Sequence, residues 1–242
     1  MKLICFPHAG GMSGYYAFLK RAPLAGIDSV DLVEYPGRGS RAAQEGYRDF
    51  QDCVERVSAR LADEGLEDGC YVLFGHSMGA FVAYEVACLL QERYGLRPLH
   101  VFVSGQKPPC RVVPEHYAQC ESDGIDFLKR LGGVPELILE DEGIARYFIG
   151  LCAKDLRILQ TYSPRPPDPA NRPLVGSVIC GDDDLEVSLD ELEDWRGYFA
   201  VPPQVKVMHG NHFYLREREE ELVAFMNERL RASAAAGLRR GA

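Results

Sequence analysis

Short apolar runs alternate with longer segments of helical periodicity along most of this chain of 242 residues. The alternation predicts βαβ units, and therefore an α/β fold with a mostly parallel sheet and helices on both faces. We expect strands at residues 2–6, 28–34, 71–74, 99–103, 173–180 and 205–208. We expect helices at residues 13–21, 50–64, 80–94, 189–198 and 217–231.

Residues 114–162 interrupt this alternation. They contain two or three helix-like segments and no convincing strand, with Gly132-Gly133 as a flexible break. A helical insertion in an α/β sheet is either a lid over a site or a decoration that extends the core. We therefore divide the chain into an α/β core at 1–113 and 163–231, a helical lid insertion at 114–162, and a flexible tail at 232–242.

The bulk composition excludes several classes of function. A net charge of −9 disfavours a nucleic-acid surface. The first apolar run stops at Pro7, so we expect no secretory signal, and no run is long enough to cross a membrane. The eight cysteines form no C-x-x-C pair, which indicates buried free thiols and disfavours zinc. We therefore expect a cytoplasmic protein.

The segment Gly75-His76-Ser77-Met78-Gly79 has the pattern G-x-S-x-G. The pattern alone arises by chance, but here it follows an apolar strand and opens an apolar helix, as the nucleophile elbow of an α/β-hydrolase does. Glycines at both outer positions allow strand and helix to approach closely, and the helix N-terminus favours negative charge at the serine. We therefore predict that Ser77 is a nucleophile.

A nucleophilic serine needs a histidine as base, and the chain has six. His76 is expected to point away around the elbow, His100 lies in a strand, and His116 lies in the insertion. The remaining candidates are His8, His209 and His212. The chain order serine, acid, histidine favours His212, which follows the last strand. His209 and His212 could form half a metal site, but no carboxylate spacing completes it.

The third member of a triad orients the histidine and should follow a strand between serine and histidine. The run Asp182-Asp183-Asp184 follows the strand expected at 173–180, and spacing alone does not choose among the three aspartates. An oxyanion hole would take one backbone N–H from Met78. The second should come from the loop after the first strand, residues 6–11.

Five segments together resemble the type II thioesterases of the α/β-hydrolase fold, which accompany nonribosomal peptide and polyketide synthases. The likeness extends from residue 3 to about residue 230, and the segments occur in the family's order. They are FPHAGG, PGRG, GHSMGA, LGGVP and GNHFYL.

This resemblance implies roles for individual residues. It implies Ser77 as nucleophile, His212 as base and Asp184 as acid, with the amides of Ala9 and Met78 forming the oxyanion hole. It also implies that the insertion is a mobile lid over an acyl chamber.

The resemblance further implies a substrate and partners. The substrate would be an acyl thioester on the phosphopantetheine arm of an acyl or peptidyl carrier protein, hydrolysed without metal or cofactor. The carrier would be a transient partner of a monomeric enzyme that binds neither nucleic acid nor membrane. A basic patch for carrier docking would come from Arg38 and Arg41, or from Lys107 and Arg111. The alternative is that these residues are solvated loop charges with no role in docking. The residues leave three alternative functions open: a small-molecule esterase, an acyltransferase and a non-catalytic binding protein.

Overall fold

The computed structural model describes residues 1–118, 123–131, 140–170, 172–173 and 175–238. Over these residues the chain forms one six-stranded sheet in the order β2-β1-β3-β4-β5-β6, with every neighbouring pair parallel. The α/β fold expected from the alternation is confirmed. The strands are β1 (Lys2–Phe6), β2 (Ser29–Leu32), β3 (Tyr71–His76), β4 (His100–Ser104), β5 (Gly176–Gly181) and β6 (Gln204–Met208).

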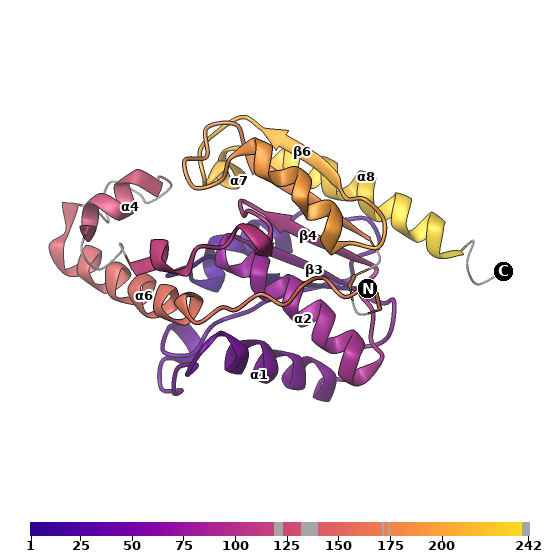
Figure 1. Ribbon diagram of the computed structural model, residues 1–242, viewed down its shortest axis with the longest axis horizontal. Helices are drawn as coiled ribbons and strands as arrows, with labels where there is room; N and C mark the ends of the chain where they lie inside the picture. Colours follow the sequence, from indigo (N-terminus) through magenta and orange to yellow (C-terminus); the bar gives the residue numbers. More distant parts are fainter. Residues whose placement is uncertain (119–122, 132–139, 171, 174, 239–242) are drawn as a thin grey trace.

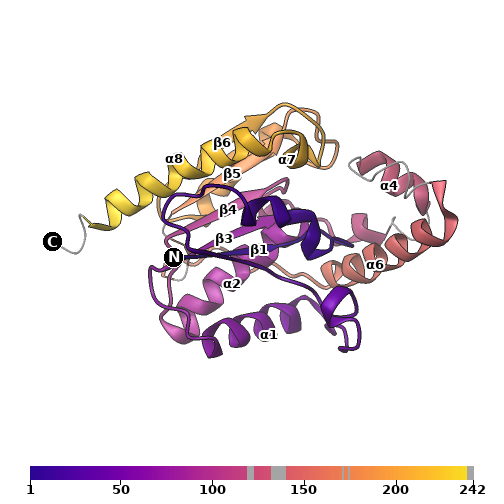
Figure 2. The same cartoon turned by 180° about the vertical axis from the view of Figure 1, so that it is seen from behind.

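Helices cover both faces of this sheet, as Figures 1 and 2 show from opposite sides. The pair α1 and α2 lies on one face, and α8 lies on the other. The α-helices are α1 (Phe50–Asp63), α2 (Met78–Tyr94), α4 (Ile125–Leu131), α6 (Glu142–Gln160), α7 (Tyr214–Glu217) and α8 (Glu219–Leu238). The 3-10 helices are η1 (Ser13–Lys20), η2 (Gly39–Arg41), η3 (Pro109–Arg111), η4 (Pro114–Ala118) and η5 (Leu189–Tyr198).

Alternate strand residues point to the two faces, so the sheet separates two apolar cores. On β3, Leu73 packs into the core beneath α1 and α2, while its neighbours Val72 and Phe74 pack into the core beneath η1 and α8. Strand β3 lies between β1 and β4, and all its residues are buried because helices cover both faces of the sheet (Figures 1 and 2). Its continuous apolar sequence is typical of a central parallel strand.

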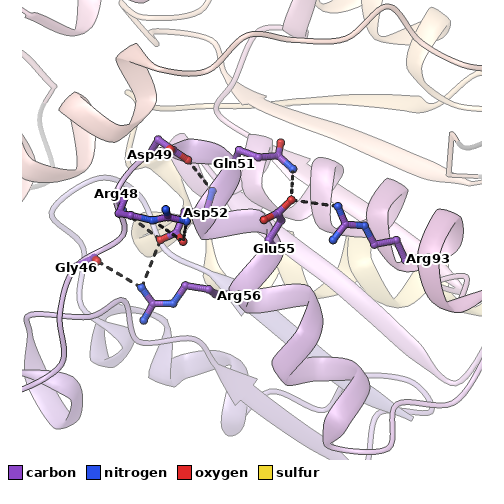
Figure 3. Close-up of polar contacts among 8 residues, drawn as sticks. All are labelled: Gly46, Arg48, Asp49, Gln51, Asp52, Glu55, Arg56 and Arg93. Atoms are coloured by element: carbon purple, nitrogen blue, oxygen red, sulfur yellow. Dashed lines mark hydrogen bonds and ion pairs between the residues drawn. The ribbon is translucent and has the colours of Figure 1, made fainter.

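Polar contacts fix α1 at its start and against α2 (Figure 3). Asp49 caps the helix by accepting a hydrogen bond from the backbone N–H of Asp52. The Asp52 carboxylate in turn bonds to Arg48 at 2.8 Å. Farther along α1, Glu55 accepts a hydrogen bond from Arg93 of α2 at 3.1 Å. These contacts link the start of α1 to the segment before it and the middle of α1 to α2 (Figure 3).

The insertion and the tail differ in part from expectation. Helices η4, α4 and α6 occur between residues 114 and 162 and lie beyond one end of the sheet (Figure 1). The expected break at Gly132-Gly133 and most of the LGGVP segment lie outside the described residues. The last helix was expected to end at residue 231, but α8 continues to Leu238. Its extra turn is fixed by Ser233, whose hydroxyl bonds to buried His100.

The cysteine prediction is correct at some positions and wrong at others. Cys5, Cys53 and Cys180 are buried free thiols as expected. Cys70, directly before β3, and Cys110, in the short surface helix η3, are free but exposed. In the described part of the chain, no helix is both long enough and apolar enough to cross a membrane.

Candidate active site

The candidate site lies where the strand order reverses. From β1 the chain adds β2 on one side, then returns to place β3 on the other side of β1. Loops that leave β1 and β3 at their carboxyl ends therefore diverge, which opens a crevice between them. The loop after β1 begins at Pro7, and the turn after β3 contains Ser77.

Ser77 occupies a strained turn between β3 and α2. Its φ of 54° makes it the single non-glycine residue with positive φ among the described residues. The strain persists because strand and helix nearly touch. A Cβ at Gly75 would lie 1.9 Å from the carbonyl oxygen of Gly79, and a Cβ at Gly79 would lie 2.1 Å from that of Phe6. Ser77 is the N-cap residue of α2 but its side chain makes no capping bond, so the hydroxyl is left to the crevice.

His212 and one of the three aspartates form a buried pair. The Asp184 carboxylate is bonded to His212 Nδ1 at 2.8 Å, and the two side chains are 0% and 4% exposed. Asp182 instead bonds to His209 at the surface, and Asp183 is exposed. The geometry therefore brings Asp184 and His212 together and leaves the other two aspartates outside the site.

Two further histidines surround His212. The ring of His76 lies 5.0 Å from that of His212 between centroids, and the ring of His8 lies 6.1 Å from that of His76. Burial, together with the nearby His212 and Arg38, lowers the pKa of His8 to about 3. Burial, followed by the neighbouring His212 and His8, also lowers the pKa of His76 well below its ordinary value. Both rings are therefore neutral at neutral pH, whereas His212 faces a carboxylate that can balance a positive charge.

Two backbone N–H groups are available near Ser77. No hydrogen bond among the described residues uses the N–H of Ala9 or of Met78. The next two N–H groups of the first loop are occupied, since Gly10 donates to Asp155 at 2.7 Å and Gly11 donates to the His8 carbonyl at 2.9 Å. Ala9 and Met78 are thus the donors that an oxyanion in this crevice could engage.

Ser77 and His212 line one cavity, whose empty volume including its solvent-open mouth is about 640 Å³. Ala9 also lines it, at the start of the oxyanion loop (His8–Gly11). One part of the wall is mostly apolar and comes largely from the helical insertion. Its members are Val113, Tyr117, Phe127, Cys152, Leu156 and Leu159. Polar side chains line another part, namely Gln106, Lys107, His116 and Glu186.

The interpretation of Arg38 as a surface charge is wrong. Its side chain is 2% exposed, because it forms an ion pair with Asp155 of α6. Arg111 is at the surface but bonds to Asp194, and Lys107 lines the cavity.

Sequence reasoning missed Asp155 altogether. The available signal was its position three residues after Cys152 and next to Leu156, on the stripe of α6 that is otherwise apolar.

No metal site accompanies these residues within the described ranges, where three or more His, Cys, Asp or Glu side chains do not gather. What the arrangement can do follows from its parts. A strained serine, a histidine oriented by a buried carboxylate, and two free N–H groups beside a partly apolar cavity are the elements of acyl transfer through a covalent intermediate.

Comparison with known proteins agrees with this chemistry. The family model described as the thioesterase domain matches residues 1–230. Thioesterase PikA5 of Streptomyces venezuelae is 30% identical over 233 residues, which are 95% of this chain and 81% of that protein.

Two solved structures are similar in fold as well as in sequence. The type II thioesterase BorB from the borrelidin biosynthetic cluster superimposes with a TM-score of 0.78 at 29% identity, over 95% of this chain and 92% of that one. The RedJ thioesterase from the prodiginine pathway of Streptomyces coelicolor gives a TM-score of 0.81 at 28% identity, over 95% and 90% of the two chains.

Proposed function

This chain belongs to the thioesterase domain family, and we propose that it hydrolyses acyl groups held as thioesters on the phosphopantetheine arm of carrier proteins. It is a serine hydrolase with the α/β-hydrolase fold, an editing thioesterase of type II in nonribosomal peptide and polyketide biosynthesis. The observation that carries the proposal is the Asp184–His212 pair, which is buried beside the cavity that Ser77 lines.

The proposed mechanism has two half-reactions. His212 takes the proton of the Ser77 hydroxyl as its oxygen attacks the thioester carbonyl carbon, and Asp184 balances the imidazolium. The oxyanion accepts hydrogen bonds from the Ala9 and Met78 amides. The thiol of the arm leaves with the proton from His212, and water activated by His212 then releases the carboxylic acid and regenerates Ser77.

We also propose that residues 114–162 act as a lid over the acyl chamber. Support comes from the cavity wall, to which η4 contributes Tyr117, α4 contributes Phe127 and α6 contributes Leu156. An apolar wall of this kind suits the acyl chain, and the polar part with Lys107 suits the more hydrated arm. The carrier protein is thus a transient partner, and we expect the enzyme to act as a cytoplasmic monomer.

The test compares carrier-bound acyl groups with free esters of the same acids, using wild type and Ser77→Ala. We expect wild type to hydrolyse the carrier-bound thioesters faster, and Ser77→Ala to form no acyl-enzyme, because no other hydroxyl occupies the elbow. Ser163→Ala is the matched control, since this exposed serine does not line the cavity. Acyl-enzyme formed by Ser77→Ala would refute the nucleophile, and preference for the free ester would refute the carrier substrate.

A further inference from the structure

A buried ion pair lies directly behind the oxyanion loop. Arg38, which follows β2, donates through Nη1 to Asp155 Oδ2 at 2.6 Å and through Nη2 to Oδ1 at 2.5 Å. The two side chains are 2% and 3% exposed. Removing two charges from water is so costly that such a pair contributes little net stability. Its role is therefore better sought in what the two side chains hold in place.

Both partners also bind the backbone just after Ala9. Asp155 Oδ2 accepts the N–H of Gly10 at 2.7 Å, and Arg38 Nη1 donates to the carbonyl oxygen of Gly11 at 3.1 Å. The Gly10 N–H belongs to the peptide unit that begins with the Ala9 carbonyl. These bonds therefore fix the rotation of the chain on the carboxyl side of Ala9. They also keep the Gly10 N–H occupied, so that the Ala9 N–H is the one presented to the cavity.

Close packing of α6 reinforces this arrangement. Gly10 has a φ of +74°, and a Cβ there would lie 3.0 Å from the Cα of Cys152, one helical turn before Asp155. The backbone of α6 thus rests on the loop at the point where its carboxylate binds. Two neighbouring side chains of the same helix, Leu156 and Leu159, line the cavity.

On the basis of the proposed thioesterase mechanism, we propose that Arg38 and Asp155 are positioning residues of the oxyanion hole. The ion pair holds the Ala9–Gly10 peptide so that the Ala9 N–H points to the oxygen that becomes negative when Ser77 attacks. Neither side chain touches the substrate in this arrangement.

A role of this kind predicts a particular kinetic signature. The Ala9 N–H acts when the oxyanion forms, so its displacement lowers kcat and leaves KM for the carrier-bound substrate unchanged. The upper limit is complete loss of one oxyanion donor, about 10²–10³-fold in kcat. Affinity for an acyl trifluoromethyl ketone, which forms an oxyanion when the Ser77 hydroxyl adds to it, should fall by the same factor as kcat.

The central experiment compares Asp155→Asn with Asp52→Asn in the full chain. Asp52 is the matched control because its carboxylate is 9% exposed and pairs with Arg48 and Arg56 on the surface of α1 (Figure 3). We expect kcat and ketone affinity to fall together by about 10²-fold in Asp155→Asn. In Asp52→Asn only the thermal midpoint should change. The proposal is overturned if Asp155→Asn matches the control, or if kcat falls without loss of ketone affinity.

A second variant separates positioning from folding. Arg38→Met combined with Asp155→Leu removes both charges, an exchange that often leaves stability unchanged or higher. It still removes the bonds to Gly10 and Gly11, so we expect a wild-type thermal midpoint with the same loss of kcat. A folded double variant with wild-type kcat would overturn the proposal.

A measurement on the wild type needs no variant. When the ketone binds, the amide proton of Ala9 should move downfield in the nuclear magnetic resonance spectrum, while that of Gly10 stays bonded to Asp155. A downfield shift at Gly10 in place of Ala9 would overturn the positioning role. If wild type does not hydrolyse the thioester, the proposed function fails instead, so the two failures are distinguishable.

Discussion

Replacing Asp184 by asparagine should nearly abolish turnover. The carboxylate lies 2.8 Å from His212 Nδ1, and both side chains are buried. At an effective dielectric constant of about 20, a carboxylate and an imidazolium at this distance attract each other by about 6 kcal/mol. The imidazolium exists only while a proton is in transit, so the attraction stabilises the transition state. An energy of this size corresponds to about 10⁴-fold in rate, which is also the loss seen when a serine protease has asparagine in this role.

Asp182→Asn provides the matched control within the same turn. Its carboxylate is 45% exposed and bonds to His209 at the surface, so we expect kcat to remain near wild type. The assay is steady-state release of thiol from an acyl-pantetheine thioester, together with the rate of acyl-enzyme formation. Equal losses in the two variants, or more than about a tenth of wild-type kcat in Asp184→Asn, would refute the electrostatic reasoning.

Two other predictions concern stability. Gly79→Ala should lower the free energy of unfolding by about 3 kcal/mol or more, because the new Cβ would overlap the Phe6 carbonyl. Gly14→Ala is the control, since a Cβ there meets open space and should leave the midpoint of a urea titration nearly unchanged. Three histidines have lowered pKa values, namely the buried His76 and His100 and the half-buried His8. Because the unfolded chain binds more protons there, stability should fall as pH drops below about 6.5, by up to about 1.4 kcal/mol per pH unit for each ring. Urea titrations with the same midpoint at pH 7 and pH 5 would contradict this.

The sheet could be predicted from sequence because its strands carry strong local signals. The apolar run 71–74 becomes the first four residues of β3, which continues to His76, and such a run is typical of a strand in the centre of a parallel sheet. The helices expected at residues 13–21 and 189–198 are present in the structure, but they are the 3-10 helices η1 and η5. Hydrophobic periodicity does not distinguish a 3-10 helix from a short α-helix, because apolar residues three and four apart fit both.

The choice among the three aspartates shows what short stretches of sequence cannot determine. Asp182, Asp183 and Asp184 are chemically alike and follow one another directly after β5, so their spacing from Ser77 and His212 does not distinguish them. Only the loop after β6 gives the first and the third of them different partners: His209 lies 27 residues after Asp182, and His212 lies 28 residues after Asp184. The resemblance to type II thioesterases pointed to Asp184, and the hydrogen bond to His212 is the physical reason for preferring it.

Arg38 shows a different limit. From sequence, an arginine between two glycines in a loop is expected to be a solvated cation, because arginine side chains are mostly exposed in folded proteins. Its burial depends on a carboxylate that lies 117 residues away in the sequence. The aspartate on the apolar stripe of α6 was visible in the sequence, but its partner was not, since several arginines could have reached it.

The cavity beside Ser77 has two kinds of wall, and the difference matters for any attempt to change the acyl-chain preference that we propose for it. Cys152 and Leu156 belong to the turn of α6 that holds the oxyanion loop, so mutating them risks the chemistry along with the fit. Val113 and Tyr117 line the same chamber from the segment before and within η4, and neither bonds to the Arg38–Asp155 pair among the described residues. A combinatorial library aimed at acyl selectivity is therefore best confined to these two positions, where the enzyme can acquire new substrates without first losing its rate.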